Sequence, residues 1–272
     1  MTPTVDVIIV SYNTERDLDA CLASLHEHRS EHVEKIVVVD NASADESVKH
    51  TRTRWSRVHV IPLDKNIGFG PANNVAIRRS TADLVLLLNS DAQVRAGSID
   101  TLVARLMERD AVAAGPRLID GKGRPEISWG PMLSPFAELR QRGRVNRAKG
   151  TGPIARRLTA RLVRRERFVD WVSGACLLVR REAALAAGLF DERFFMYEED
   201  VDLCASLRAA GGRILFTPRA EVVHLRGRSR TSAPLRGIGH YDRSHLAFYE
   251  KHLPQWAPAL RLWLRLKGRR LR

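Results

Sequence analysis

The stretch V-D-V-I-I-V-S-Y-N, residues 5–13, decides the fold class of this chain. Residues 5–10 are mostly apolar and rich in β-branched side chains, which is typical of a strand buried on both faces of a parallel sheet. A helix is expected directly afterwards, because Thr14 and Asp17 form a capping box ahead of apolar residues at helical spacing. A strand that leads straight into a helix is the building unit of an α/β fold.

The strand-then-helix order continues through the first third of the chain. Strands are predicted at 36–39, 58–62 and 84–88, and the helices between them begin at a capping box in residues 43–46 and at Gly70-Pro71. The remaining expected elements are helices at 98–108, at 182–187 and ending near 210, and strands at 112–118, 172–179, 214–216 and 221–225. This alternation predicts a mostly parallel central sheet flanked by helices, with right-handed crossovers.

Length and composition exclude several classes of protein. The 272 residues are 44% hydrophobic and 28% charged, which excludes collagen-like, disordered and disulfide-scaffold chains. The three cysteines form no C-x-x-C pair, so neither a structural zinc site nor a redox dithiol is predicted. The longest apolar run, residues 84–88, is far shorter than the roughly 18 residues that span a bilayer, and the N-terminus lacks the layout of a signal peptide. We therefore expect a cytoplasmic protein.

The net charge of +14 is concentrated in two segments. Eleven Lys and Arg residues lie between 140 and 167 against Glu166 alone, and six more lie between 261 and 272 with no acid, while the rest of the chain is nearly neutral. These clusters contain few interleaved aromatic residues and no nucleic-acid recognition motif. No nucleic-acid partner is therefore expected.

The basic segments also divide the chain. Residues 1–135 and 168–230 are expected to form two halves of one domain, separated by a basic insertion at 136–167, and residues 231–272 form a C-terminal helical basic extension. The end of this extension alternates leucines and Trp263 with arginines, which is typical of a segment on an anionic membrane surface. A solvated basic terminus is the alternative, because the amphipathic stretch is short. A tail that binds lipid would make the protein peripheral on the inner face of the cell membrane.

Polar side chains follow each of the first four predicted strands. In an open parallel sheet, ligands bind beyond the carboxyl ends of the strands, so these residues are the first candidates for a binding site. They are Ser11-Tyr12-Asn13, Asp40-Asn41, Asp64-Lys65-Asn66 and Asn89-Ser90-Asp91. The first strand-to-helix turn contains no glycine and no P-loop motif occurs, which argues against the glycine-dependent nucleotide sites. A nucleotide would be bound here by side chains.

Seven short motifs, in order between about Val5 and Ser229, carry a resemblance to a known family. They are V-I-I-V-S-Y-N, V-V-V-D-N-A-S, N-I-G-F-G-P-A-N-N, L-L-N-S-D, W-V-S-G-A, F-F-M-Y-E-E-D-V-D-L-C and V-V-H-L. In this order they resemble the inverting glycosyltransferases of family 2, which have the GT-A nucleotide-sugar-binding fold, and most closely their rhamnosyltransferase-like bacterial members. The resemblance implies that residues 1–135 bind the nucleotide sugar and that residues 168–230 form the acceptor and catalytic half.

The resemblance also implies which residues bind the donor. Asp40 is expected to accept a hydrogen bond from the base or a ribose hydroxyl, with Tyr12 beside the base, although Asp40 alone is equally typical of a turn. Asn73 resembles a nucleotide contact, but its place in a helix leaves a solvated surface role open. Trp171 suits a sugar face and Gly174 a close backbone approach, with a structural tryptophan as the alternative. The full implied set is Ser11, Tyr12, Asn13, Asp40, Asn66, Asn73, Asn89, Ser90, Trp171, Gly174, Arg226 and Arg228.

Asn89-Ser90-Asp91 stands where the family has its Asp-x-Asp metal motif. A carboxylate at a strand end can hold Mg²⁺ or Mn²⁺, hard cations that bridge the diphosphate of a donor. Because the first acid is replaced by Asn89, Asp91 is the expected direct ligand and the metal affinity is expected to be modest. His224 resembles the second metal ligand of the family. The alternatives are a simple turn and a structural histidine.

The acidic run Glu198-Glu199-Asp200 is the expected catalytic segment. Acids in the first turn of a helix often serve the helix dipole, but three adjacent acids beside the aromatic run 194–197 indicate perturbed carboxylates. An inverting transferase needs one base to take the proton of the acceptor hydroxyl. The resemblance implies Asp200 for that role, with Glu199 orienting it or contacting the acceptor. Asp202 is expected to face solvent.

The loop after the late histidine carries Arg226, Arg228 and Arg230. The leaving group is a nucleoside diphosphate anion, so arginines that close over its phosphates would neutralise charge as the bond breaks. A generic basic loop is the alternative interpretation.

Two rival functions stay open on the residues alone. A nucleotidyltransferase on a related sheet would need a glycine-rich phosphate loop after the first strand, where this chain has S-Y-N-T. A non-enzymatic polyanion or nucleic-acid binder is suggested by net charge. The expected function is metal-dependent, inverting transfer of a hexose or deoxyhexose, with rhamnose as one candidate, from a nucleotide diphosphate sugar to a hydroxyl of a glycan or lipid-linked acceptor in cell-envelope polysaccharide synthesis.

Overall fold

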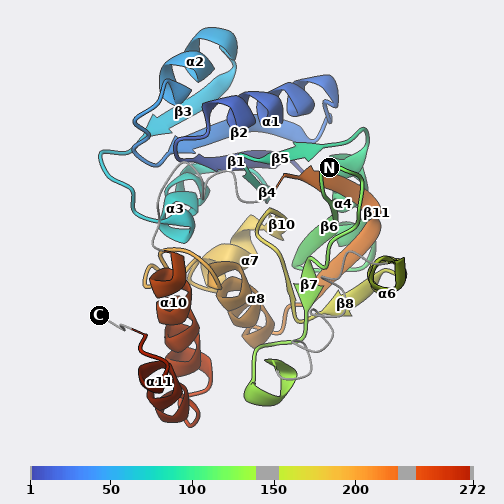
Figure 1. Ribbon diagram of the computed structural model, residues 1–272. Helices are drawn as coiled ribbons and strands as arrows, with labels where there is room; N and C mark the ends of the chain where they lie inside the picture. The colour runs from blue at the N-terminus through green and yellow to red at the C-terminus, as the bar shows by residue number, and fades with distance from the viewer. Residues whose placement is uncertain (1, 139–152, 226–236, 270–272) are drawn as a thin grey trace.

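A nine-stranded mixed sheet forms the centre of the molecule, and helices cover both of its faces (Figure 1). The structure is a computed structural model that describes residues 2–138, 153–225 and 237–269. Eight strands run in the order β3-β2-β1-β4-β10-β6-β11-β5, and β8 pairs with β11 beside this path. The predicted α/β class with a mostly parallel sheet and flanking helices is confirmed.

The first half of the sheet is parallel throughout. Its strands are β1 (Val5–Ser11), β2 (Val33–Asp40), β3 (Val58–Pro62) and β4 (Leu84–Asn89), all close to the predicted ranges. The register pairs Ser11 with Asp40 and Val10 with Asn89. The polar residues after these strands therefore meet at one edge of the sheet.

The second half of the sheet adds antiparallel pairs. β10 runs antiparallel between β4 and β6, and β11 is parallel to β6 and antiparallel to β5 and β8. The bounds are β5 (Ala92–Val94), β6 (Ala113–Ile119), β8 (Arg167–Val169), β10 (Cys176–Arg180) and β11 (Ile214–His224); β7 (Trp129–Gly130) and β9 (Trp171–Val172) form a separate pair.

Two predicted strand boundaries are wrong in this half. The strand expected at 172–179 is broken into β9 and β10, because residues 173–175 leave the ladder and turn toward α8. The two strands expected at 214–216 and 221–225 are one strand, β11, with a register shift between Thr217 and Glu221. A bulge lets the chain continue in the same ladder where the sequence pattern is interrupted.

The helices divide between two cores, one on each face of the sheet. α1 and α4 pack on the face that carries Val7 and Ile9, and α3, α7 and α8 pack on the face that carries Ile8 and Val10. This alternation follows from the period of two along a strand. The helices are α1 (Glu15–Glu27), α2 (Ser47–Arg54), α3 (Phe69–Arg79), α4 (Ser98–Glu108), α6 (Pro153–Leu162), α7 (Arg181–Ala186), α8 (Glu199–Ala209), α10 (Gly237–His252) and α11 (Ala257–Leu266).

The two predicted capping boxes are not formed. α2 begins at Ser47, past the expected Ser43, and the backbone N–H of Ser43 donates to Asp40 Oδ2 at 2.9 Å. Thr14 does precede α1, but its hydroxyl donates to Ser90 Oγ at 3.0 Å. Both residues make tertiary contacts at the strand ends, which the local pattern does not reveal.

α10 and α11 pack against α8 through a third core (Figure 1). Phe248, Tyr249 and Ala257 are buried there together with Phe194 and Val201. Of the predicted basic insertion, 139–152 lie outside the described residues, 153–162 form α6, and Arg167 begins β8. No helix in the described ranges is long and apolar enough to cross a membrane.

Candidate active site

Asp40 ends β2 at the polar edge of the sheet and is only 2% exposed. Its Oδ2 accepts from the backbone of Ser43, whereas its Oδ1 is buried and has no hydrogen-bond partner among the described residues. Buried polar atoms are nearly always paired, so an unpaired carboxylate oxygen at a strand end fits a ligand that donates a hydrogen bond.

Asn41 and Asn66 shape the loop beside Asp40. Asn41 Nδ2 donates to Asn66 Oδ1 at 2.9 Å, and its Oδ1 accepts from the backbone of Ile67 at 2.9 Å. Asn66 Oδ1 also accepts from the Gly68 N–H at 3.0 Å. Asn66 thus lies at the expected edge but is engaged in holding its own loop, and Asn41 proves to be the organising residue.

Gly68 is the point where the two halves of the chain approach each other. It has φ +94°, and a Cβ built on it would lie 2.4 Å from the carbonyl oxygen of Phe195. The neighbouring Phe69 N–H donates to the same oxygen at 2.9 Å. A side chain at position 68 would separate these backbones, so glycine is required both for its conformation and for its size.

Asn73 and Asn74 are both buried, so the solvated alternative considered for them is wrong. Asn74 donates to the Phe190 carbonyl at 2.8 Å and accepts from the Phe190 N–H at 3.0 Å, which ties α3 to the second half. Asn73 Nδ2 donates to the Phe69 carbonyl, and its Oδ1 is buried without a partner in the described part of the chain. Asn73 therefore offers a second acceptor to a ligand.

The residues after β1 hold neighbouring loops. Asn13 adopts φ 52°, accepts from the Ala44 N–H at 2.7 Å and donates its own N–H to Ser43 Oγ at 2.9 Å. Ser11 is fully buried with its Oγ 3.0 Å from Thr14 Oγ1. Tyr12 is half-buried at the same strand end. A direct donor contact of these three residues stays a prediction.

The two expected metal ligands lie side by side. His224 Nε2 is 3.3 Å from Asp91 Oδ1, and Asn89 Nδ2 is 3.4 Å from the same nitrogen. The antiparallel pairing of β11 with β5 places His224 opposite Ala92, which brings these distant residues together. Glu126, which sequence reasoning missed, lies 3.9 Å from His224 Nδ1.

The donor set fits a hard divalent cation that is completed by its substrate. No group of three His, Cys, Asp or Glu side chains able to hold a metal occurs in the described ranges. Mg²⁺ is commonly bound through one or two protein ligands together with substrate phosphates and water. Asp91 and His224 supply such a partial set, beside the Ser90 hydroxyl, which is fixed by Thr14.

Asp200 is held in the first turn of α8 by two backbone N–H groups. Its Oδ2 accepts from Gly174 at 2.7 Å and its Oδ1 from Val201 at 2.8 Å. Burial raises the pKa of Asp200 above the ordinary carboxyl value, and the two N–H donors offset part of that rise. Burial and the adjacent Asp200 raise the pKa of Glu199 to about 8. Glu199 Oε2 is buried with no partner in the described chain.

Gly174 lies between the acidic residues at the start of α8 and the end of β4. The next residue, Ala175, accepts from the Asn89 N–H at 3.0 Å, while Gly174 itself donates to Asp200. Asp200 and the Asn89–Asp91 turn therefore lie at the same edge of the sheet. A Cβ at Gly174 would lie 3.2 Å from the Cβ of Asp200, so the close approach expected at this glycine is an approach to α8.

Trp171, Arg226 and Arg228 are the remaining residues of the predicted set. Trp171 donates its indole N–H to the Pro131 carbonyl at 2.8 Å and packs on Gly130, contacts that serve the β7–β9 pair. A sugar contact for Trp171 stays a prediction. Arg226 and Arg228, with the neighbouring Arg230, lie outside the described residues.

The expectation that Asp202 faces solvent is wrong. Asp202 is fully buried, and it accepts from Lys251 Nζ at 2.9 Å and pairs with His252 Nε2 at 2.6 Å. Both partners come from α10, far along the chain, and no local pattern announces them. A buried carboxylate needs such pairing because its desolvation is costly.

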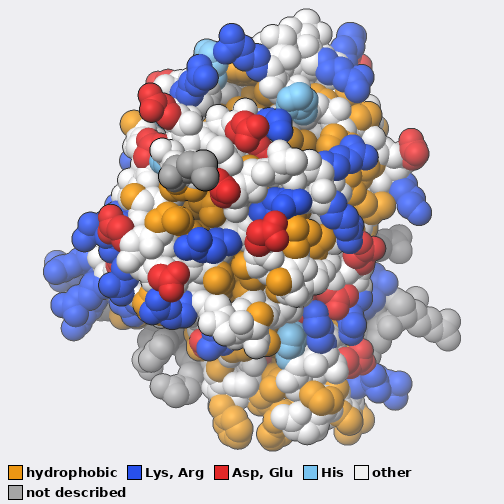
Figure 2. Space-filling view, turned by 180° about the vertical axis from the view of Figure 1, so that it is seen from behind, with side chains coloured by type: hydrophobic (Ala, Val, Ile, Leu, Met, Phe, Trp, Pro, Cys, Tyr) orange, Lys and Arg blue, Asp and Glu red, His pale blue; other side chains and the backbone are white. Residues whose placement is uncertain are grey.

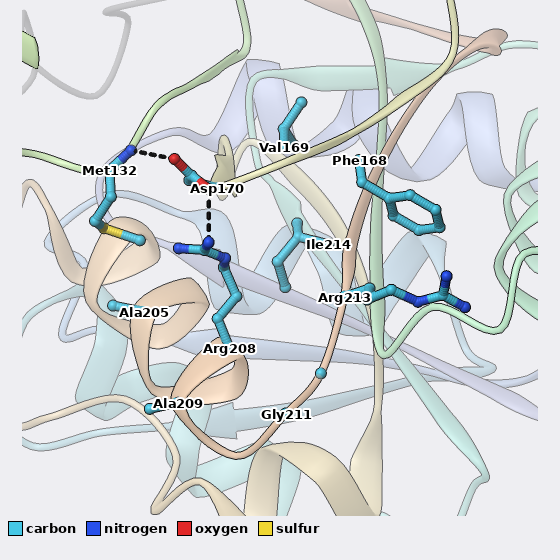
Figure 3. A pocket seen from close by; sticks show the side chains of 11 residues that line it. Met132, Phe168, Val169, Asp170, Ala205, Arg208, Ala209, Gly211, Arg213 and Ile214 are labelled. Atoms are coloured by element: carbon cyan, nitrogen blue, oxygen red, sulfur yellow. Dashed lines mark hydrogen bonds and ion pairs between the residues drawn. The ribbon is translucent and has the colours of Figure 1, made fainter.

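A cavity of about 580 Å³ opens at the opposite end of α8 (Figure 3). Asp170 there accepts from the Met132 N–H and from Arg208, each at 2.8 Å, and Arg213 stacks over Phe168. None of the site residues described above lines this cavity. Its size does not make it the active site, because the perturbed carboxylates lie at the other helix end.

Sequence comparison now decides the family. A profile described as glycosyl transferase family 2 matches residues 6–170. The chain belongs to this family. It is also 34% identical, over 97% of its length and 90% of the relative, to the N-acetylglucosaminyl-diphospho-decaprenol L-rhamnosyltransferase of Mycobacterium tuberculosis. The rhamnosyltransferase WbbL of Escherichia coli is 26% identical over 81% of this chain and 83% of the relative. The protein is thus a rhamnosyltransferase-like glycosyltransferase.

Solved structures share the fold of this glycosyltransferase. The structure of GalNAc-T7 with UDP, GalNAc and Mn²⁺ superposes with a TM-score of 0.65 at 18% identity over 91% of this chain, which spans 48% of that structure. The mannosyltransferase PcManGT of Pyrobaculum calidifontis, in complex with GDP-Man and Mn²⁺, gives 0.60 at 18% identity over 96% of this chain and 69% of that one. The GT-A fold is confirmed.

The raised pKa values of Asp200 and Glu199 predict that transfer fails on acidification. A base must be ionised, so we expect kcat to fall on acidification, with an apparent pKa of the coupled pair above the ordinary carboxyl value of about 4. Glu199→Gln removes the partner with the pKa of about 8 and leaves Asp200 in place, so the acid limb should remain in this variant. Initial rates at saturating donor measure both profiles, with exposed Glu192→Gln as the control. A rate that stays constant down to about pH 5 would contradict the assignment.

Proposed function

We propose that this glycosyltransferase inverts the anomeric centre as it transfers a deoxyhexose from a nucleoside diphosphate sugar to a lipid-linked acceptor. The observation that carries the proposal is the position of Asp200. Gly174 holds it by a hydrogen bond of 2.7 Å at the sheet edge that also carries Asp91 and His224. A base thus faces the edge at which a donor diphosphate would be bound.

Asp200 performs the proton transfer of this reaction. Its carboxylate takes the proton of the acceptor hydroxyl while that oxygen attacks the anomeric carbon, and the bond from this carbon to the diphosphate breaks on the opposite face. The N–H groups of Gly174 and Val201 fix both carboxylate oxygens. Burial raises the pKa of Asp200 and so makes it a stronger base than an exposed aspartate.

Asp91 and His224 would hold Mg²⁺ or Mn²⁺, with the remaining positions filled by donor phosphates and water. The ion supplies charge neutralisation for the leaving diphosphate. Arg226 and Arg228 are proposed to add to this from the following loop. Asp40 and Asn73, each with an unpaired buried oxygen, are proposed to accept hydrogen bonds from the nucleoside.

The relatives support the proposed substrate classes. The M. tuberculosis protein is named for rhamnose transfer to a diphospho-decaprenol-linked sugar, and a Shigella flexneri relative, 26% identical over 84% of this chain and 71% of the relative, is named dTDP-rhamnosyl transferase. We therefore propose rhamnose as the sugar, a deoxythymidine diphosphate as the leaving group and a polyprenyl-diphosphate-linked sugar as the acceptor, in cell-envelope glycan synthesis.

A membrane-bound acceptor requires a membrane-facing surface, and α11 provides one. Leu262 and Leu266 are 60% and 79% exposed, and Trp263 lies beside them, while Leu264 on the inner side is 1% exposed. Lys267 lies over the Trp263 ring at 3.9 Å. Exposed apolar side chains next to cations are typical of a helix in the headgroup region of an anionic bilayer.

This surface extends beyond the helix. Phe136 is exposed and meets Trp256 edge-to-face with ring centroids 6.1 Å apart. Figure 2 shows hydrophobic side chains gathered at the lower end of the molecule, where Figure 1 places α11, with Lys and Arg beside them. We propose that this end of the enzyme rests on the inner face of the membrane that holds the acceptor.

Asp200→Asn tests the catalytic assignment. The substitution keeps the shape of the side chain but removes its basicity, so we expect kcat to fall at least about 10³-fold while the donor dissociation constant changes less than about twofold. Release of nucleoside diphosphate from dTDP-rhamnose in the presence of a polyprenyl-diphosphate sugar measures the first quantity, and calorimetry measures the second. Asp110→Asn, at an exposed aspartate on the surface, is the matched control. Turnover retained by Asp200→Asn would remove Asp200 from its role.

Metal removal tests Asp91 and His224. Dialysis against EDTA should abolish transfer, and Mg²⁺ or Mn²⁺ should restore it. His224→Gln is expected to raise the Mn²⁺ concentration needed for half-maximal rate about 10- to 100-fold, because one ligand is lost. Titration of the apo enzyme with Mn²⁺ and dTDP, followed by calorimetry, gives the same comparison without turnover. Full activity in EDTA would rule out the metal site.

Polar substitution of the α11 surface tests the membrane proposal. Leu262→Ser, Trp263→Ser and Leu266→Ser together should reduce binding to anionic vesicles about 10²-fold or more, since each buried apolar side chain contributes about 1.5–3 kcal/mol. Transfer to a water-soluble acceptor analogue should be unchanged. Met107→Ser, at an exposed apolar residue on α4, is the control. Unchanged co-sedimentation of the triple variant with anionic vesicles would contradict the proposal.

A further inference from the structure

The chain bends sharply immediately before the proposed catalytic base. Tyr197 and Glu198 have φ 72° and 63°, two consecutive non-glycine residues in the left-handed region. Such conformations are strained for residues with a side chain and persist only where surrounding contacts hold them. Glu198 is the residue that precedes α8, so this bend sets the direction of the turn that carries Asp200.

α3 and α10 hold this bend from two sides. On one side the Phe69 N–H donates to the Phe195 carbonyl at 2.9 Å. On the other side Ser244 Oγ donates to the Met196 carbonyl at 2.7 Å, and His245 Nδ1 lies 2.7 Å from Glu198 Oε1. Two successive residues of α10 thus contact Met196 and Glu198, the residues on either side of Tyr197.

His245 is buried between two carboxylates. Its Nδ1 faces Glu198, its Nε2 is 3.3 Å from Glu138 Oε2, and its ring stacks on Tyr241 with centroids 5.6 Å apart. Tyr249 donates its hydroxyl to Glu138 on the far side. An imidazolium donates from both nitrogens, so His245 pairs with one oxygen of each acid at the same time.

The charge state agrees with this geometry. Burial alone would lower the pKa of His245, but its hydrogen bonds with Glu138 and Glu198 raise it to about 10. Burial raises the pKa of Glu198, and the hydrogen bond with His245 offsets part of the rise. The histidine is therefore protonated at neutral pH, and the contact with Glu198 is charge-assisted, the stronger class of hydrogen bond.

We propose that His245 is a positioning residue for glycosyl transfer: by binding Glu198 it holds the left-handed bend at residues 197–198, and so it aims the Asp200 carboxylate at the acceptor. This inference rests on the proposed function of Asp200 as base. It assigns the C-terminal extension to the catalytic unit, since α10 completes the support of α8. Lys251 and His252 on the same helix anchor the next turn through Asp202.

The proposal predicts a particular kinetic signature. The proposed nucleoside contacts Asp40 and Asn73 come from the first half of the chain, whereas the base depends on the bend. Loss of His245 should therefore lower kcat and leave the donor KM nearly constant. A displacement of about 1 Å at a reacting group costs on the order of 10²-fold in rate.

The experiment compares His245→Gln with Glu250→Gln in the full chain. Glu250 lies on the same helix, is exposed and pairs with Arg261 of α11, so its variant controls for general changes in α10. We expect kcat to fall on the order of 10²-fold for His245→Gln, with donor KM changed less than about twofold, and to stay constant for Glu250→Gln. The proposal would be overturned if His245→Gln lowered kcat and raised the donor KM by the same factor, or if it changed neither.

Hydrogen–deuterium exchange gives a second readout that needs no substrate. In His245→Gln, amides 194–202 should exchange faster than in the wild type, while amides of β1 and β4 keep their rates. Ser244→Ala removes one hydroxyl and keeps the helix, so it should speed exchange in the same segment to a smaller extent even if His245→Gln folds poorly. Unchanged exchange of amides 194–202 in both variants would overturn the proposed support of the bend by α10. Absence of transfer by the wild-type enzyme would instead refute the proposed function, with the exchange result unaffected.

Discussion

The hydrogen bond from the Gly174 N–H to Asp200 is the contact on which the site depends. It joins the broken strand between β9 and β10 to the first turn of α8, and the adjacent Ala175 carbonyl binds the strand end that carries Asp91. One short segment thus sets the relation between the buried Asp200 and the strand end that carries the Asp91–His224 pair. The absence of a side chain at Gly174 is what permits this approach, because a Cβ there would lie 3.2 Å from the Asp200 side chain.

Buried charge is the second constraint. Four acids lie at the start of α8: Glu198 just before the helix, and Glu199, Asp200 and Asp202 in its first turn. Glu198 and Asp202 are paired with bases from α10, while Glu199 and Asp200 lack such partners among the described residues. The paired acids hold the start of the helix in place, and burial raises the pKa values of Glu198, Glu199 and Asp200. The same run of sequence therefore supplies both the anchors and the reactive groups. α10 supplies the bases that pair with Glu198 and Asp202. α11 follows α10 in the chain and carries exposed apolar side chains.

The first half of the fold could be predicted from the sequence because its signals are local. Each of the first four predicted runs became a parallel strand, with β3 at the exposed edge of the sheet, and the polar residues at the strand ends met at one edge, as the sheet register requires. The pairing of Asp91 with His224 was predicted through family resemblance, and the structure places the two side chains 3.3 Å apart. The capping boxes at Thr14 and Ser43 failed because tertiary hydrogen bonds engage both hydroxyls: that of Thr14 donates to Ser90, and that of Ser43 accepts from the Asn13 N–H.

The sequence alone determined the α/β class, the order of the first elements and the motifs of the family, since period, turn residues and short motifs are properties of neighbouring residues. Only the tertiary structure decided that Asp202 is buried, that Asn41 holds the loop beside Asp40 and that His245 contacts Glu198 in the bend before Asp200. These facts depend on which distant segments pack together. A charged side chain in a sequence looks the same whether it meets water or a buried partner, and only packing distinguishes the two.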